Sequence, residues 1–277
     1  MIPKIDAHHH SWKYDPATYG WIDESMSGIR CDFYPEDLLP SLQENGVMGT
    51  VLVQSDQSPG DNQFMLSQAK ANSFIKGIVG WIDLVAPDLA EQLSEWKEQS
   101  LMKGFRHVAQ AEPDDFLARP EVIRGIEALG LFGFTYDILV KPPQMAAALQ
   151  LVKALPDQPF VIDHIAKPYI AAGAIAEWEN DLKMLAACAN VYCKVSGMVT
   201  EANWENWKKA DLRPYLDVVF EAFGSNRLMY GSDWPVCLVA ASYNEVMGIA
   251  EEFTRDLSEE EQKAFWHDNA VQFYSLD

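Results

Sequence analysis

The sequence contains few cysteines, and their spacing gives them no evident structural role. The four cysteines are Cys31, Cys188, Cys193 and Cys237, and no two of them form a CxxC pair. Because disulfide frameworks and zinc knuckles depend on closely spaced pairs, we predict neither of them. Free thiols in a reducing compartment are expected.

Basic residues are also scarce, with 21 lysines and arginines against 41 aspartates and glutamates and a formal net charge of −20. This excess repels phosphate backbones and anionic lipid headgroups, so we expect neither nucleic acid nor a membrane as a partner. No apolar run reaches the roughly 18–20 residues that a membrane-spanning helix needs, and no basic segment followed by an apolar run opens the chain. We therefore expect a cytoplasmic protein.

The chain does contain a regular alternation of short apolar runs and amphipathic segments. Eight runs have the composition of buried strands: residues 2–7, 49–55, 75–84, 102–108, 132–140, 160–168, 190–198 and 227–235. Helical patterns lie between them, several opened by proline and closed by glycine. Near-continuous apolar strands that alternate with helices need cover on both faces of the sheet. This pattern predicts an α/β fold of one domain, a (β/α)8 TIM barrel, with a doubly wound open sheet as the alternative.

Two further segments stand out from this alternation. Residues 11–35 form an aromatic-rich connection that is long for a simple link. At the other end of the chain, Ser258 and Glu261 match a capping box, which predicts a C-terminal helix over about residues 258–274.

Three consecutive histidines end the first predicted strand, in the sequence IDAHHHSW. Alternate side chains of a strand share a face, so His8 and His10 should point together while His9 points away. Two converging imidazoles suit a divalent cation or the polarisation of a carbonyl oxygen. The alternative is a tag remnant or an exposed strand end. It is weakened because the run follows an apolar strand directly and has no linker.

Polar residues recur at the carboxyl ends of other predicted strands, which is where barrel enzymes place their chemistry. These residues are Arg106, His107, Tyr136, Asp137, Asp163, His164, Lys194, Ser196 and Asp233. Arg106 and His107 must point to opposite faces, and we expect His107 to point into the barrel. His164 could instead be a structural histidine, and Asp233 could cap a turn. Lys194 stands in an apolar strand, which is an unfavourable place for an idle ammonium.

Five segments in order resemble the amidohydrolase superfamily, amidohydrolase family 2, and within it the sugar lactonases that include the fuconolactonases. They are DAHHHSW, GFRHVAQAEPDDF, VIDHIAKP, CKVSGMVTEANW and GSDWPVC, and the likeness runs from residue 3 to about residue 273. The resemblance implies a (β/α)8 barrel whose catalytic centre contains His8, His10, His164 and Asp233.

The resemblance also bears on metal content. Members of the superfamily with two metals carry a lysine or glutamate on strand four and histidines on strands five and six. Here strand four offers Arg106 and His107, and strand five offers Tyr136 and Asp137. At most one divalent ion is therefore expected, zinc in first place and manganese if oxygen ligands dominate. Its expected ligands are His8, His10, His164 and Asp233. The resembled lactonases imply that this ion can be dispensable.

The resemblance implies a hydrolase that opens an aldonolactone, such as L-fucono- or L-rhamnono-lactone. Lactone hydrolysis needs a base for water, stabilisation of the oxyanion and a proton for the leaving alkoxide. We expect Asp233 to be the base, and His8, His10 and His164 to polarise the carbonyl. His107 is expected to orient the substrate or to supply the proton.

Few arginines are placed to bind a dicarboxylate, since only Arg106 ends a strand while Arg30 and Arg119 lie in loops. We therefore expect a neutral, polyhydroxylated substrate. The side chains expected to contact it are Trp12, Arg106, Tyr136, Lys194, Ser196 and Trp234.

Two other functions stay open, a metal-dependent decarboxylase of the same superfamily and a barrel that binds its ligand without turnover. Exposed aromatic loops would also permit a homodimer.

Overall fold

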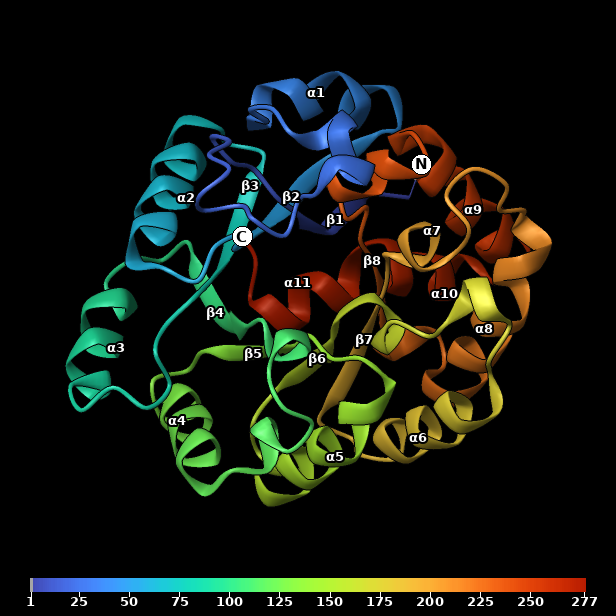
Figure 1. Ribbon diagram of the computed structural model, residues 1–277. Helices are drawn as coiled ribbons and strands as arrows, with labels where there is room; N and C mark the ends of the chain where they lie inside the picture. The colour runs from blue at the N-terminus through green and yellow to red at the C-terminus, as the bar shows by residue number, and fades with distance from the viewer. Residues whose placement is uncertain (1) are drawn as a thin grey trace.

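The computed structural model describes residues 2–277, and over these residues a sheet of eight parallel strands is surrounded by helices (Figure 1). The strands are β1 (Lys4–His9), β2 (Val47–Val53), β3 (Ile75–Gly80), β4 (Met102–His107), β5 (Thr135–Ile138), β6 (Phe160–Ile162), β7 (Val191–Val195) and β8 (Leu228–Tyr230). Each strand pairs with the next one along the chain. A parallel bridge between His9 and Trp234 joins the two edges. The sheet therefore closes into the predicted (β/α)8 barrel.

Helices cover the outer face of this sheet, as Figure 1 shows. They are α1 (Pro35–Glu44), α2 (Pro59–Ala71), α3 (Leu89–Lys97), α4 (Pro120–Leu131), α5 (Met145–Ala154), α6 (Ala176–Ala186), α8 (Lys209–Phe223) and α9 (Tyr243–Thr254), while the short α7 (Met198–Glu201) follows the carboxyl end of β7. Proline opens α1, α2 and α4, where its missing N–H has no partner to lose. Among residues 2–277, no helix combines the length and the apolar character needed to cross a bilayer.

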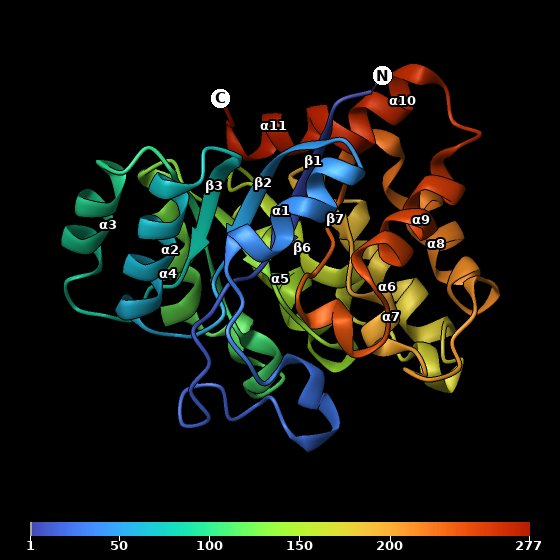
Figure 2. The same ribbon diagram turned by 90° about the horizontal axis from the view of Figure 1, so that it is seen from above.

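The C-terminal segment closes the amino-terminal end of the barrel. It comprises α10 (Glu259–Lys263), one π-helical turn (Ala264–Asp268) and α11 (Asn269–Tyr274). The predicted capping box is present, because Ser258 accepts from the Glu261 backbone N–H and Glu261 accepts from that of Ser258. Figure 2 shows α11 across the end at which β1 begins. Its residues pack on apolar side chains of the barrel interior, among them Val51, Val79 and Val161.

The long loop of residues 11–35 lies at the opposite, carboxyl-terminal end of the barrel (Figure 2). It has a small core of its own, because Trp12, Tyr19, Ile22 and Ile29 are buried against one another. The Trp12 indole is fully buried, and its Nε1 donates a hydrogen bond of 2.9 Å to the carbonyl oxygen of Cys31. The aromatic residues of this loop therefore hold it in one fixed shape at the barrel mouth.

Candidate active site

The histidines of β1 owe their direction to an irregularity in the strand. The register of β1 against β2 shifts between Asp6 and His9, and His8 points into the barrel although Ala7 also belongs to the interior apolar cluster. A bulge of this kind re-aims the side chains that follow it. His9 points outward, and its Nε2 lies 2.9 Å from Thr50 Oγ1. His8 and His10 therefore share the inner face, as predicted.

Four donors from β1, β6 and β8 meet at the mouth. His8 Nε2 lies 3.2 Å from His10 Nε2, and His10 Nε2 lies 3.4 Å from Asp233 Oδ1. Asp233 Oδ1 is 4.0 Å from His8 Nε2 and 3.8 Å from His164 Nε2. All four side chains are buried, with at most 5% of any residue exposed. The sequence prediction that these four residues converge agrees with this geometry.

The backbone is strained where it presents two of these donors. His164 and Asp233 have φ angles of 53° and 58°, in the left-handed region of backbone conformation that residues other than glycine seldom adopt. The left-handed conformation continues through Ile165, Ala166 and Lys167. Ile165 is β-branched, which makes this conformation especially unfavourable. Strain of this kind gathers at functional sites, where the surrounding structure enforces it.

The protonation states of the group follow from its burial. Burial lowers the pKa of His164 to about 4, although the Asp233 carboxylate opposes this shift, and it lowers the pKa of His8 well below its usual range. Burial alone would raise the pKa of Asp233. The nearby His164 and His10 rings and the Lys167 ammonium outweigh that effect and hold the pKa below its usual value. At neutral pH His8 and His164 are therefore neutral imidazoles, and Asp233 is an ionised carboxylate.

These donors fit a single divalent ion. Ligands that surround zinc tetrahedrally at about 2.1 Å lie about 3.4 Å from one another. The separations among His8, His10 and Asp233 span that value, and these residues form a group whose ligand atoms all lie within 4.8 Å of one another. His10 Nδ1 is 2.8 Å from the carbonyl oxygen of Val53, so it carries the proton and leaves Nε2 free to bind an ion.

A layer of buried charge lies beneath this group, and here one sequence prediction was wrong. Arg106, not His107, points into the barrel. Its Nη1 lies 3.0 Å from Asp163 Oδ2 and 3.3 Å from His8 Nε2, and its Nε donates to Gln54 Oε1 at 3.1 Å. The alternation of β4 admits only one of the two side chains, and the guanidinium is the one that finds buried partners. Sequence reasoning missed Gln54, and it named Asp163 as a polar residue at a strand end without giving it a role.

His107 lies instead at the rim, where it is partly exposed. Its Nε2 donates to Glu112 Oε1 at 3.1 Å, and its Nδ1 accepts from Trp81 Nε1 at 3.4 Å. The ring stacks on Phe116 with 4.6 Å between the centroids. His107 is therefore held in a fixed orientation, but outside the group of four donors.

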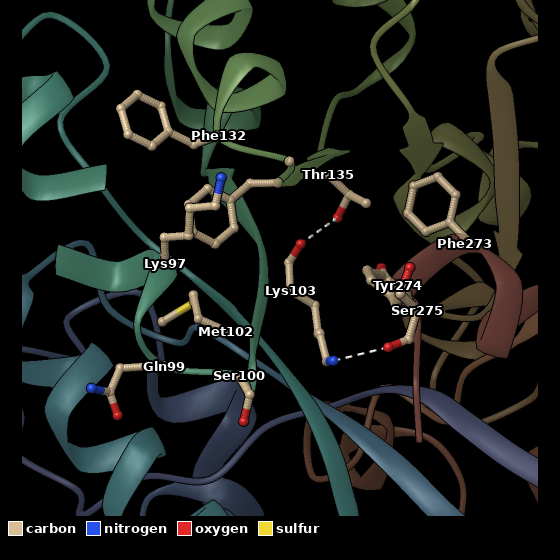
Figure 3. A pocket seen from close by; sticks show the side chains of 12 residues that line it. Lys97, Gln99, Ser100, Met102, Lys103, Phe132, Thr135, Phe273, Tyr274 and Ser275 are labelled. Carbon is tan, nitrogen blue, oxygen red and sulfur yellow. Dashed lines mark hydrogen bonds between the residues drawn. The ribbon is translucent and has the colours of Figure 1, made fainter. Parts of the chain in front are cut away.

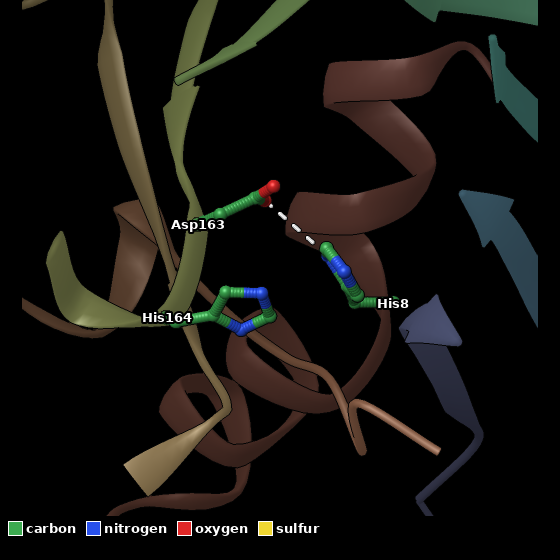
Figure 4. Close-up of side chains that lie close together, drawn as sticks. All are labelled: His8, Asp163 and His164. Carbon is green, nitrogen blue, oxygen red and sulfur yellow. Dashed lines mark ion pairs between the residues drawn. The ribbon is translucent and has the colours of Figure 1, made fainter. Parts of the chain in front are cut away.

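Asp163 offers a second possible donor group together with His8 and His164 (Figure 4). His8 Nδ1 lies 3.3 Å from Asp163 Oδ1. However, Asp163 already has Lys194 Nζ 3.0 Å from Oδ1 and Arg106 Nη1 3.0 Å from Oδ2. Because these two cations neutralise the carboxylate and repel a divalent ion, the second group suits a metal less well than the first.

The expected substrate contacts fall into two sets. Ser196 Oγ lies 2.9 Å from His164 Nδ1, and Trp234 follows Asp233 directly, so both residues border the four donors. Tyr136 does not, because it packs in the outer layer of the barrel, edge-to-face on Phe160, and Asp137 takes the inward position on β5. Trp12 is buried in the core of its loop. Neither of these rings is presented to a ligand in this structure.

A pocket lies at the opposite end of the barrel from this chemistry. It has a volume of about 230 Å³, and Lys97, Lys103, Phe132 and Tyr274 are among its lining residues (Figure 3). Lys103 Nζ donates there to the carbonyl oxygen of Ser275 at 2.9 Å. None of the four donors lines this cavity, which lies at the end of the barrel closed by α11.

Comparisons with known proteins cover the whole chain. A family model described as amidohydrolase matches residues 5–276. The chain is 38% identical to an L-fucono-1,5-lactonase of Burkholderia multivorans, over 99% of this chain and 96% of that protein. It is 33% identical to an L-fucono-1,5-lactonase of Burkholderia ambifaria, over 100% of this chain and 97% of that protein.

Solved structures agree with these relatives. An amidohydrolase from Burkholderia multivorans, crystallised with bound zinc, superposes with a TM-score of 0.95 at 37% identity and covers 99% of both chains. A dihydroxybenzoic acid decarboxylase from Polaromonas sp. JS666, crystallised with manganese, has a TM-score of 0.69 at 13% identity over 99% of this chain and 97% of that one. The latter likeness is one of fold alone.

Proposed function

The chain belongs to the amidohydrolase family, and on that premise we propose that it is a hydrolase that opens a sugar lactone to the free acid. One observation carries the proposal: the chain resembles L-fucono-1,5-lactonases over its full length. The four buried donors that form one group are consistent with it. An aldonolactone such as L-fucono-1,5-lactone is the substrate class that this likeness favours. The decarboxylase alternative has only the distant structural likeness on its side.

Asp233 is proposed as the general base. It is the anionic member of the group, and its carboxylate faces His10 and His164 across 3.4 Å and 3.8 Å. A water molecule bound against Oδ1 could pass its proton to this oxygen while it attacks the lactone carbonyl carbon. Asp233 has a left-handed backbone conformation, and its carboxylate faces the imidazoles of His10 and His164.

The imidazoles of His8, His10 and His164 are proposed to polarise the carbonyl oxygen, either directly or through a bound ion. His10, whose proton is on Nδ1, would act through the ion. Preorganised donors at the position where negative charge develops typically account for the largest part of the rate enhancement, with about 3 kcal/mol for one donor. The Arg106 guanidinium lies 3.3 Å from His8 Nε2 and adds a positive charge beneath them. His107, fixed at the rim by Trp81 and Glu112, is proposed to orient the substrate or to protonate the leaving alkoxide.

One divalent ion fits the same residues, and His8, His10, His164 and Asp233 would hold it. When bound, zinc would supply a Lewis acid at the carbonyl oxygen and lower the pKa of a bound water molecule. The bond from His10 Nδ1 to Val53 serves this arrangement as well, because it turns the unprotonated Nε2 toward the site.

A neutral substrate is favoured because the cationic side chains of the site are already paired with carboxylates of the protein. Arg106, the arginine at a strand end, is already bound to Gln54 and Asp163, so its fork is not available to a substrate carboxylate. Lys194 is likewise paired with Asp137 and Asp163. Ser196 and Trp234 then remain as proposed contacts for sugar hydroxyls and the ring face.

The proposal is tested by a panel of aldonolactones, in which acid release is followed with a pH indicator before and after treatment with a chelator. We expect hydrolysis of at least one deoxy-sugar lactone, with aromatic carboxylic acids left unchanged. Release of carbon dioxide from an aromatic acid, abolished by the chelator, would favour the decarboxylase. Binding of a lactone without turnover would favour the inactive barrel.

Two further properties belong to the same proposal. A cytoplasmic location is consistent with free thiols at the four cysteines. A homodimer is supported by Trp21 and Leu238, apolar side chains that remain exposed in the described residues. Size-exclusion chromatography with light scattering tests the dimer.

A further inference from the structure

Asp6 is a buried carboxylate to which the proposed hydrolysis gives no role. It lies two residues before His8 on β1, and none of its surface is exposed. Burial raises the pKa of this carboxyl to about 6, and the groups that oppose the shift are hydrogen-bond donors from Ser232, His8 and Tyr243 rather than a cation. A buried carboxylate without a paired cation is unfavourable, so its hydrogen bonds should explain why it is there.

The first and last strands of the barrel meet without the ladder that joins the other strands. From β1–β2 to β7–β8, every pair of neighbouring strands is joined by a parallel ladder. Between β1 and residues 231–234, which follow β8, the described residues form one isolated backbone bridge, that of His9 with Trp234. We call this contact the seam. His8 Nε2 and Asp233 Oδ1 lie 4.0 Å apart across it, so whatever holds the seam sets the distance between two proposed site residues.

The Asp6 side chain supplies an acceptor at the seam where a ladder would use a backbone carbonyl oxygen. Its Oδ1 accepts from the backbone N–H of Ser232 at 2.9 Å and from that of His8 at 3.2 Å. The next backbone N–H, that of Asp233, donates to the carbonyl oxygen of His8 at 2.9 Å. One carboxylate oxygen thus ties His8 to the residue that precedes Asp233.

Two neighbours support this arrangement. Tyr243 Oη, from α9, donates to Asp6 Oδ2 at 3.2 Å, so both carboxylate oxygens are used. Gly231 allows the chains to approach closely, because a Cβ there would lie 2.7 Å from His8 Cβ. Since Oδ1 binds backbone groups of the seam and Oδ2 binds a side chain of α9, mutation can separate the two contacts.

From these contacts we propose that Asp6 is a positioning residue, which fixes His8 and Asp233 relative to each other across the seam of the barrel. The role requires an acceptor at Oδ1 and does not require a negative charge. Its effect on rate rests on the proposed lactone hydrolysis, whereas its effect on geometry is measurable without turnover. Catalytic groups misplaced by about 1 Å lose on the order of 100-fold in rate.

Asp6→Ala removes the acceptor, and we expect kcat of the folded protein to fall about 100-fold with little change in KM. In a crystal structure of this variant, the distance between His8 Nε2 and Asp233 Oδ1 should differ from that of the wild-type protein. Asp6→Asn should restore both kcat and the distance, because its amide keeps an acceptor at Oδ1 and can donate to Tyr243 Oη. The matched control is Tyr243→Phe, which removes the contact to Oδ2 alone. It should lower the thermal unfolding temperature and leave kcat and the distance unchanged.

A wild-type kcat or an unchanged distance in Asp6→Ala overturns the inference, as does an Asp6→Asn protein as slow as Asp6→Ala. If Asp6→Ala does not fold, Ser232 is replaced by its α-hydroxy acid, which removes the N–H donor alone. A lower kcat and a changed distance in that protein support the inference, and wild-type values contradict it. If the wild-type protein hydrolyses no lactone, the proposed function fails while the crystal structures still test the role of Asp6.

Discussion

The Nδ1 atom of His10 lies 2.8 Å from the carbonyl oxygen of Val53, the last residue of β2. This bond holds the proton on Nδ1 and turns Nε2 toward Asp233. An asparagine at position 10 can keep the bond to Val53 but has no atom in place of Nε2.

We therefore expect His10→Asn to fold normally and to lose about 100-fold in kcat/KM, because it removes the Nε2 lone pair that would hold an ion at the carbonyl oxygen. Steady-state kinetics and thermal unfolding of the same preparation check this expectation. The control is His9→Asn, because His9 points away from the site toward Thr50. Equal losses in the two variants would show that position 10 acts through the fold alone.

Gly197 is the position at which a single methyl group should disturb the site. A Cβ there would lie 2.7 Å from Cγ and Nδ1 of the His164 ring, and the φ angle of 62° is unfavourable for alanine. We expect Gly197→Ala to lower the free energy of unfolding by about 1–3 kcal/mol and to reduce kcat by displacing the ring.

Urea denaturation and kinetics measure the two effects of Gly197→Ala. Gly133→Ala serves as a control, because its φ of 83° carries a similar backbone cost while nothing lies within 4 Å of its added Cβ. Loss of activity in both variants would argue against a specific effect on His164.

Tyr274 ties α11 to the buried charge layer. Removing its hydroxyl leaves Asp137 Oδ2 with Lys194 as its remaining partner, so Tyr274→Phe should destabilise the protein by about 1–3 kcal/mol. Urea denaturation followed by circular dichroism measures this difference. Tyr169→Phe, at an exposed tyrosine, should change stability by less than about 0.5 kcal/mol. A Tyr274→Phe protein as stable as the wild type would mean that the hydroxyl adds nothing to the network.

The barrel could be predicted from the sequence because each strand is a short run of buried apolar residues. The ends of the strands were less accessible. The predicted run of residues 160–168 is a strand only over Phe160–Ile162, because the next residues turn into left-handed conformations. Apolar composition indicates that residues are buried, but it does not reveal where the ladder of hydrogen bonds stops.

The four donors could be located because each lies near the carboxyl end of a strand and all are polar residues in apolar surroundings. The directions of Arg106 and Tyr136 were harder to predict. The sequence shows that successive side chains of β4 and β5 point to opposite faces of the sheet, but it does not show which of them point into the barrel. That choice depends on partners from other strands, such as Asp163 and Gln54. Tyr274 was missed because an aromatic residue near the end of an amphipathic helix resembles ordinary packing.

Asp233 is the group proposed to accept a proton from water, and the proposed hydrolysis depends on it more than on any other residue. Asp233→Asn keeps the shape of the side chain and removes its charge, so the fold should persist while hydrolysis fails. The direct measurement is kcat/KM of the wild-type and Asp233→Asn proteins on the best aldonolactone of the panel. We predict a fall of about 1,000-fold, within the range of general base catalysis. A variant that hydrolyses the lactone as fast as the wild type would contradict the account.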